Sequence, residues 1–87
     1  MKNLSGTYKL IEPNKYQSTE GQTLIVSKRK NARMGMTSHF LLMVDEEGER
    51  IYLSSLYPIN DNQYNIEYNR FRYRVNVDGG KLIINCA

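Results

Sequence analysis

The residues of this 87-residue chain that could take part in chemistry are mainly cations, and they fall into two groups. The first group lies late in the sequence and comprises Arg70, Arg72, Arg74 and Lys81. The second group comprises Lys28, Arg29, Lys30 and Arg33, and the segment 28–36 that contains it has no acidic residue. Guanidinium and ammonium groups bind phosphate and carboxylate oxygens. Both groups therefore indicate contacts with an anionic ligand.

Each group also has a simpler interpretation. The arginines at positions 70, 72 and 74 could lie on a solvated outer face and pair with acids on a neighbouring strand. The Lys28–Met36 segment could be a solvated basic hairpin loop, with a single helical turn as a further possibility. Three like charges on one strand face repel unless something neutralises them. An anionic partner and an internal acidic neighbour both remain open.

A β-hairpin is expected to position the first group. Phe71, Tyr73, Val75 and Val77 alternate with the arginines and Asn76, which gives one apolar and one cationic face. The Asp78-Gly79-Gly80 sequence that follows is typical of a tight turn. A two-residue loop at Asp78-Gly79 or at Gly79-Gly80 would place the same apolar residues opposite Leu82, Ile84 and Cys86.

The rest of the chain predicts further short strands separated by turns, with no convincing helical period. The expected strands are 6–11, 22–27, 37–44, 49–56 and 63–69. The expected loops are 14–21, 28–36, 45–48 and 57–62. Between residues 64 and 77, apolar residues occupy even positions through Tyr68 and odd positions from Phe71 onward, so the alternation shifts by one residue near Asn69-Arg70. A bulge in one long bent strand is favoured there, because Asn-Arg is a poor pair for a two-residue turn.

These elements predict one all-β domain over residues 1–87. The architecture expected is a small antiparallel barrel or curled meander sheet of about six to seven short strands, similar in size to SH3-like or OB-like domains. Seven tyrosines, two phenylalanines and no tryptophan imply that much of the core is tyrosine.

Composition and motifs argue against several classes of protein. His39 and Cys86 are the single histidine and cysteine, so neither a catalytic triad nor a zinc site is indicated. Cys86 is expected to be an apolar filler or a frayed end. We expect no enzyme activity, metal or cofactor. Without an apolar span or a secretory signal, the expected location is the cytoplasm, with no membrane partner.

The segment Leu4-Ser5-Gly6-Thr7-Tyr8-Lys9-Leu10 resembles the first strand of lipocalin-like proteins, in which a Gly-x-aromatic motif begins the barrel. The resemblance covers fewer than ten residues and implies a small-ligand barrel. Eight strands that enclose a ligand are expected to need a longer chain than this one.

The main functional prediction is a module that binds nucleic acid or a nucleoprotein. The net charge of +3 and pI of about 9.1 favour anionic partners weakly. Single-strand binders combine a cationic groove with aromatic platforms for stacking. The aromatic candidates are Tyr52, Tyr57, Tyr64 and Tyr68.

The alternative hypothesis is a small inhibitor or adaptor that binds a protein and blocks a larger enzyme complex. Arginine and tyrosine are enriched in the parts of protein interfaces that contribute most to affinity. Salt dependence separates the two hypotheses, because phosphate binding falls steeply with salt. A homodimer formed through an edge strand or the acidic 45–49 segment is also open.

Overall fold

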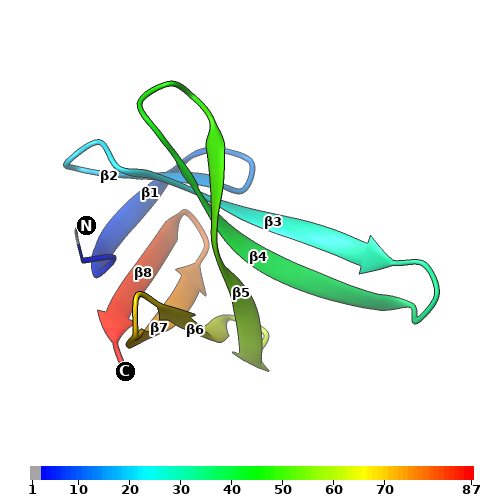
Figure 1. The fold of residues 1–87 in the computed structure, drawn as a ribbon. Coiled ribbons are helices and arrows are strands. Elements are labelled where there is room, and N and C mark those ends of the chain that lie inside the picture. Colours follow the sequence, from blue (N-terminus) through cyan, green and yellow to red (C-terminus); the bar gives the residue numbers. More distant parts are fainter. Residues whose placement is uncertain (1–2) are drawn as a thin grey trace.

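The computed structural model describes residues 3–87, which form eight antiparallel strands (Figure 1). The strands are β1 (Gly6–Glu12), β2 (Lys15–Ser18), β3 (Thr23–Asn31), β4 (Met36–Val44), β5 (Arg50–Asn60), β6 (Gln63–Tyr68), β7 (Phe71–Asp78) and β8 (Lys81–Cys86). Each strand pairs with the next, and β1 also pairs with β8, so the sheet closes into a barrel. The predicted all-β small barrel is confirmed, with one or two more strands than expected.

Inward-facing side chains from all eight strands fill the barrel. Leu24, Leu41, Val75, Leu82 and Ile84 are among the fully or almost fully buried residues. Tyr8, Tyr16 and Tyr73 are also buried, so three of the seven tyrosines belong to the core. The interior is therefore a packed core that alternation along each strand produces, as in other small barrels.

The buried hydroxyl of Tyr8 has a defined partner. It donates a hydrogen bond to the carbonyl oxygen of Leu4 at 2.8 Å and lies 3.2 Å from Oε1 of Gln22. Burial raises the pKa of this phenol above its ordinary value of 10.0, and the nearby Glu20 and Tyr73 raise it further. Tyr8 is therefore held in its neutral form.

The β7–β8 hairpin matches its prediction in face and turn. Val77 pairs with Leu82, Val75 with Ile84 and Tyr73 with Cys86, which is the register with Gly79-Gly80 as the loop. Phe71 differs from the prediction that it faces the core. It pairs with Tyr68 beside the β6–β7 turn, where the hairpin runs past the core, and 61% of it is exposed.

Three of the four expected loops contain strand residues. The predicted 14–21 loop includes β2, which pairs with both β1 and β3. Only Tyr16 of β2 is buried, and a single apolar residue gives no alternation to detect. The turn is Pro13-Asn14, where Asn14 has φ 64°. Likewise, the predicted 57–62 loop is mostly the end of β5, and only Asp61-Asn62 forms the turn.

The predicted bulge at Asn69-Arg70 is wrong. Tyr68 pairs directly with Phe71, so these two residues form a two-residue hairpin turn. Asn69 has φ 55° and Arg70 has φ 68°, which are the two left-handed conformations of a type I′ turn. The six pairs of the β6–β7 ladder hold Arg70 in a conformation that arginine rarely adopts.

The predicted basic loop 28–36 is mostly strand. β3 and β4 continue past the barrel as a two-stranded ribbon, here called the arm (residues 28–38; Figure 1). Its turn is residues 32–35, where the side-chain oxygen of Asn31 accepts hydrogen bonds from the amides of Arg33 and Met34. Gly35 has φ 64° and donates to the carbonyl of Asn31. Both faces of the arm are exposed, so no apolar alternation marks it in the sequence.

Pro58 explains where the arm separates from the barrel. The last β4–β5 pair is His39 and Leu56, and the N–H and C=O groups of each residue point toward the other strand. Backbone direction alternates along a strand, so the nitrogen of Pro58 faces the same side as Leu56. Proline has no N–H to donate there, and it is tolerated at the edge of a sheet. Within residues 3–87, β4 pairs from this point with β3 alone.

Eight strands close within this chain, although the expectation of a longer chain concerned eight strands that also enclose a ligand. Strands of four to eleven residues joined by short turns close within residues 3–87. The side chains described above fill the interior.

Candidate nucleic-acid interface

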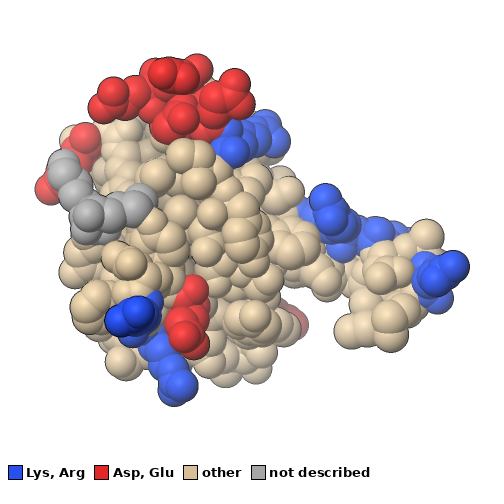
Figure 2. Space-filling model, in the orientation of Figure 1, with Lys and Arg blue, Asp and Glu red and all other residues tan. Residues whose placement is uncertain are grey.

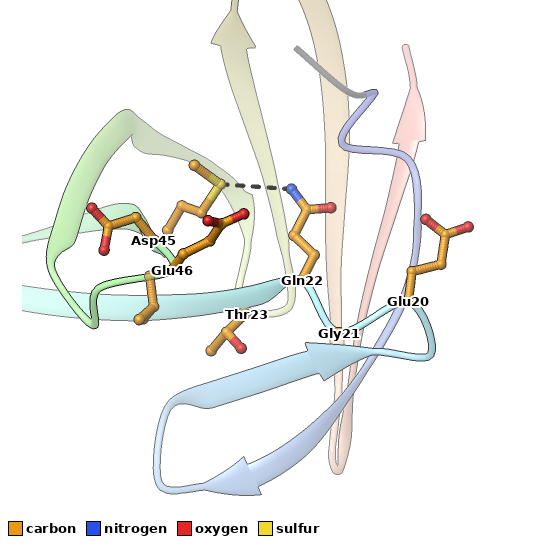
Figure 3. Close-up of a pocket in the computed structure, with 8 residues that line it drawn as sticks. Glu20, Gly21, Gln22, Thr23, Asp45 and Glu46 are labelled. Carbon is orange, nitrogen blue, oxygen red and sulfur yellow. Dashed lines mark hydrogen bonds between the residues drawn. The ribbon is translucent and has the colours of Figure 1, made fainter.

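Three surface hollows of similar size can be compared by their linings. One, of about 460 Å³, lies at the end of the barrel near the β4–β5 turn and is lined by residues that include Glu20, Asp45 and Glu46 (Figure 3). A second, of about 400 Å³, is lined by Tyr57, Arg72 and Arg74 among others. The third has about 490 Å³. Size does not distinguish them, so the chemistry of the lining does.

The third hollow lies where the arm leaves the barrel, and we call it the arm-root groove. Its lining residues are Ser27, Lys28, Arg29, Phe40, Leu42 and Tyr52. The guanidinium carbon of Arg29 is 5.8 Å from the centroid of the Phe40 ring. The rings of Phe40 and Tyr52 are 6.1 Å apart between centroids and tilted by 58°. A cation and two aromatic rings therefore form one continuous surface.

Strand register brings these side chains together. Ser27 pairs with Phe40, and Leu42 pairs with Tyr52, so residues from β3, β4 and β5 share the outer face of the sheet. The Tyr52 hydroxyl is 3.0 Å from the hydroxyl of Ser55, which restrains the ring at its far end. The Tyr52 side chain is 57% exposed, whereas Phe40 is half-buried. The outer face thus carries the half-buried ring of Phe40 and the more exposed ring of Tyr52.

The arm adds positive charge to this groove. Lys28, Arg29 and Lys30 are exposed along β3, and Arg33 is exposed in the turn at the tip. Figure 2 shows Lys and Arg side chains distributed along the arm, and the acids of the β4–β5 turn gathered on another part of the molecule. These acids are Asp45, Glu46, Glu47 and Glu49. The second predicted cationic group therefore lies beside the aromatic groove and apart from the main acidic surface.

The first predicted group lies elsewhere. β7 and β8 are opposite β3 and β4 in the strand order of the barrel. Arg74 donates from Nε to the side-chain oxygen of Asn65 at 3.0 Å, and Arg72 is opposite Glu67 across β6–β7. Lys81 is opposite Asp78 on the neighbouring strand. These cations have polar or acidic neighbours within the sheet, which agrees with the simpler interpretation of a solvated outer face.

The four predicted tyrosine platforms differ in exposure. Tyr57 is 60% exposed and lines the hollow that contains Arg72 and Arg74, while Tyr52 lines the arm-root groove. Tyr64 and Tyr68 are half-buried and pack against the core. The Tyr64 ring also lies 5.5 Å from the ring of His39. Tyr52 is thus the exposed tyrosine that lies beside the arm.

Phe40 was missed because it lies within the apolar run Phe40-Leu41-Leu42-Met43-Val44, which is typical of a strand buried on both faces. Only Leu41 of this run is fully buried. Phe40, Leu42 and Val44 lie half-buried on the outer face, where the described residues provide no second layer. Arg29 and Phe40 lie on different strands, so their contact can be inferred only from the β3–β4 register.

Comparison of the chain with protein-family models, curated proteins and solved structures finds no match. Within residues 3–87 no cluster of three or more His, Cys, Asp or Glu side chains is placed to hold a metal ion. The same residues include no helix of the length and apolar character that crossing a membrane requires.

Proposed function

We propose that this protein is a binding module for single-stranded nucleic acid, and that the strand lies across the arm-root groove and along the arm. The observation that carries this proposal is the stack of Arg29 on Phe40 next to the exposed ring of Tyr52, at the base of an arm whose charged residues are all cations. Cationic grooves with aromatic platforms bind single strands with little dependence on sequence.

Each part of the site has a distinct role in this proposal. The open face of Tyr52 provides the platform on which one base stacks. Arg29 and Lys28 contact the phosphates on either side of that base, and Lys30 and Arg33 extend the contact toward the tip of the arm. The β4–β5 turn repels the phosphate backbone, so the strand is directed away from that part of the barrel.

The test is a titration of labelled oligo-dT and of a matched duplex with the wild type and variants over a range of salt concentrations. Tyr52→Ala is expected to weaken single-strand binding by about 1–3 kcal/mol, the usual value of one stacked base. Arg29→Ala is expected to weaken binding at every salt concentration and to reduce the salt slope.

Arg72→Ala is the matched control, because it removes the same charge from the opposite side of the barrel. It is expected to change affinity little. Equal losses for Arg29→Ala and Arg72→Ala would indicate attraction to net charge without a site. Absence of single-strand binding at low salt would refute the proposal.

A protein-binding adaptor or inhibitor is the second candidate, and one observation favours it. The half-buried Leu42 and Val44 and the nearby Ile25 continue the groove as an apolar strip on the outer face. Apolar centres with Arg and Tyr nearby are typical of protein interfaces. Binding of a partner that depends on Leu42 and persists at high salt would support this candidate.

A further inference from the structure

Among the residues that the structure describes, none pairs with the outer edge of β3 along the arm. β2 pairs with β3 from Thr23 to Ile25, and the last contact on this side is a hydrogen bond of 2.9 Å from the amide of Val26 to the carbonyl of Asn14. β3 continues to Asn31, with β4 as its partner on the other side. Five residues of β3, from Ser27 to Asn31, therefore extend beyond the protection of β2.

The direction of the Val26 amide shows which backbone groups face this edge. Backbone N–H and C=O groups alternate between the two sides of a strand. The amide of Val26 points toward β2, so the N–H and C=O of Lys28 and Lys30 point to the same side. Between residues 3 and 87, none of the pairings of β3 provides a partner for these groups. The edge thus offers two donors and two acceptors in strand geometry.

We propose that this edge of β3 binds an extended acidic peptide segment of another protein by strand addition. A sheet edge binds an extended peptide through main-chain hydrogen bonds, and neighbouring side chains select its sequence. Lys28 and Lys30 lie on one face of β3, and Arg29 lies on the other. An added strand would meet cations on both of its faces, so acidic residues at successive positions fit.

A second copy of this chain fits the edge less well. Pairing of two β3 edges would bring Lys28, Arg29 and Lys30 close to the same residues of the other molecule, and like charges opposite each other destabilise a sheet. The acidic residues 45–49 lie mostly in a turn closed by hydrogen bonds to the Asp45 side chain, so they are not extended. The length of the edge, about 17 Å for five residues, matches a short linear segment.

This inference is independent of nucleic-acid binding, because it concerns main-chain hydrogen bonds. In the proposed function the side chains of Lys28 and Lys30 contact phosphates, whereas an added strand also needs the N–H and C=O groups of these residues. If the lysines served only to prevent aggregation at the sheet edge, the edge would bind neither a nucleic-acid strand nor a peptide strand. The experiment therefore has to separate side-chain charge from backbone hydrogen bonding.

The probe is a synthetic peptide of seven residues in which glutamate and threonine alternate, titrated into the full chain and followed by amide NMR signals. We expect saturable shifts of the Lys28 and Lys30 amides and slowed hydrogen exchange at both. The same peptide, N-methylated at every backbone amide so that neither of its edges can donate hydrogen bonds, is expected to bind at least tenfold more weakly to the unmodified protein. Equal affinity for the two peptides would overturn the proposal, and so would failure of the first peptide to bind.

Two variants provide a second test. Lys28→Pro removes both the charge and the N–H that faces the edge, while the β3–β4 hydrogen bonds do not use this N–H. Lys28→Ala removes the charge alone. We expect the proline variant to bind the peptide at least tenfold more weakly than the alanine variant, whereas oligo-dT binding falls equally in both. Equal peptide affinities for the two variants would show that charge alone attracts the peptide and would also overturn the proposal.

Discussion

Arg70 occupies a backbone conformation that costs free energy for a residue with a Cβ atom. Its φ of 68° follows Asn69 at φ 55° in the two-residue turn between β6 and β7. Glycine adopts this conformation without a steric cost, and Asn-Gly is the preferred pair for a type I′ turn. We expect Arg70→Gly to stabilise the fold by about 0.5–1 kcal/mol and to raise Tm by about 2–8 °C, measured by thermal unfolding.

Arg70→Ala is the control for this substitution. It removes the same charge but retains the Cβ atom, so the steric cost remains. A Tm for Arg70→Gly no higher than that of Arg70→Ala would contradict the explanation. Because Arg70 lies on the far side of the barrel from the arm, we expect neither variant to change oligo-dT binding by more than its small effect on net charge.

Tyr8 links the stability of the core to alkaline pH. Its pKa in the folded state is raised from 10.0, chiefly by burial, so above pH 10 the unfolded chain loses this proton before the folded chain does. The stabilisation that the neutral phenol provides is complete below pH 10 and is lost as pH rises through the folded-state pKa. Burial raises the pKa of Tyr16 in the same direction.

Tyr8→Phe separates the two contributions of this side chain. At neutral pH the variant loses the hydrogen bond to the Leu4 carbonyl, which should cost about 0.5–1.5 kcal/mol. Above pH 10 its free energy of unfolding should fall less steeply than that of the wild type. Urea unfolding at several pH values on either side of 10 measures both effects, and parallel curves would show that Tyr8 does not control the alkaline loss.

The arm is an element that the barrel does not need for its core. All residues from Lys28 to Ser38 are exposed. Arg29 and Ser38 face each other across the ribbon with their backbone groups paired, so Asn-Gly can replace residues 30–37 as a two-residue turn. We expect this shortened chain to unfold within a few degrees of the wild type.

The same variant should bind single strands more weakly. It retains Arg29, Phe40 and Tyr52 but removes Lys30 and Arg33, and loss of two phosphate contacts should reduce the salt slope of log K by about 1.4. Oligo-dT titrations at several salt concentrations measure this change. An unchanged slope would show that the outer half of the arm does not contact the nucleic acid.

The elements differ in how far the sequence predicts them. The β7–β8 hairpin is predictable because Tyr73, Val75 and Val77 alternate with polar residues and a Gly-Gly turn follows. β2 is not, since Tyr16 alone is buried within it. The β6–β7 turn was wrongly predicted because six cross-strand pairs outweigh the local preference against arginine at φ 68°. Tertiary pairing decides where local signals are weak or unfavourable.

The candidate site was predictable in part. Lys28, Arg29, Lys30, Arg33 and Tyr52 could be selected by residue type, but sequence spacing alone does not bring residues 29, 40 and 52 together. Register between three strands does so, and it is fixed by core residues such as Leu24 and Leu41. The two cationic groups looked equivalent in the sequence, and only barrel closure places them on opposite sides.

Charge is unevenly distributed over the closed barrel. The net charge is small, yet the arm carries cations and the β4–β5 turn carries acids (Figure 2). A polyanion that approaches the protein is oriented by this separation before any contact forms.

The seam between β1 and β8 is the strand pairing with the greatest sequence separation in the barrel. Seven of the eight strand pairings join neighbours in the chain, so they are local and can form quickly as hairpins. The eighth joins Gly6–Lys9 to Lys81–Ile84, and the loop that it closes includes most of the chain. Leu82 and Ile84 complete the core only with this step. During synthesis the first strand must therefore wait for the eighth, and until then both sheet edges are open to pairing with other chains.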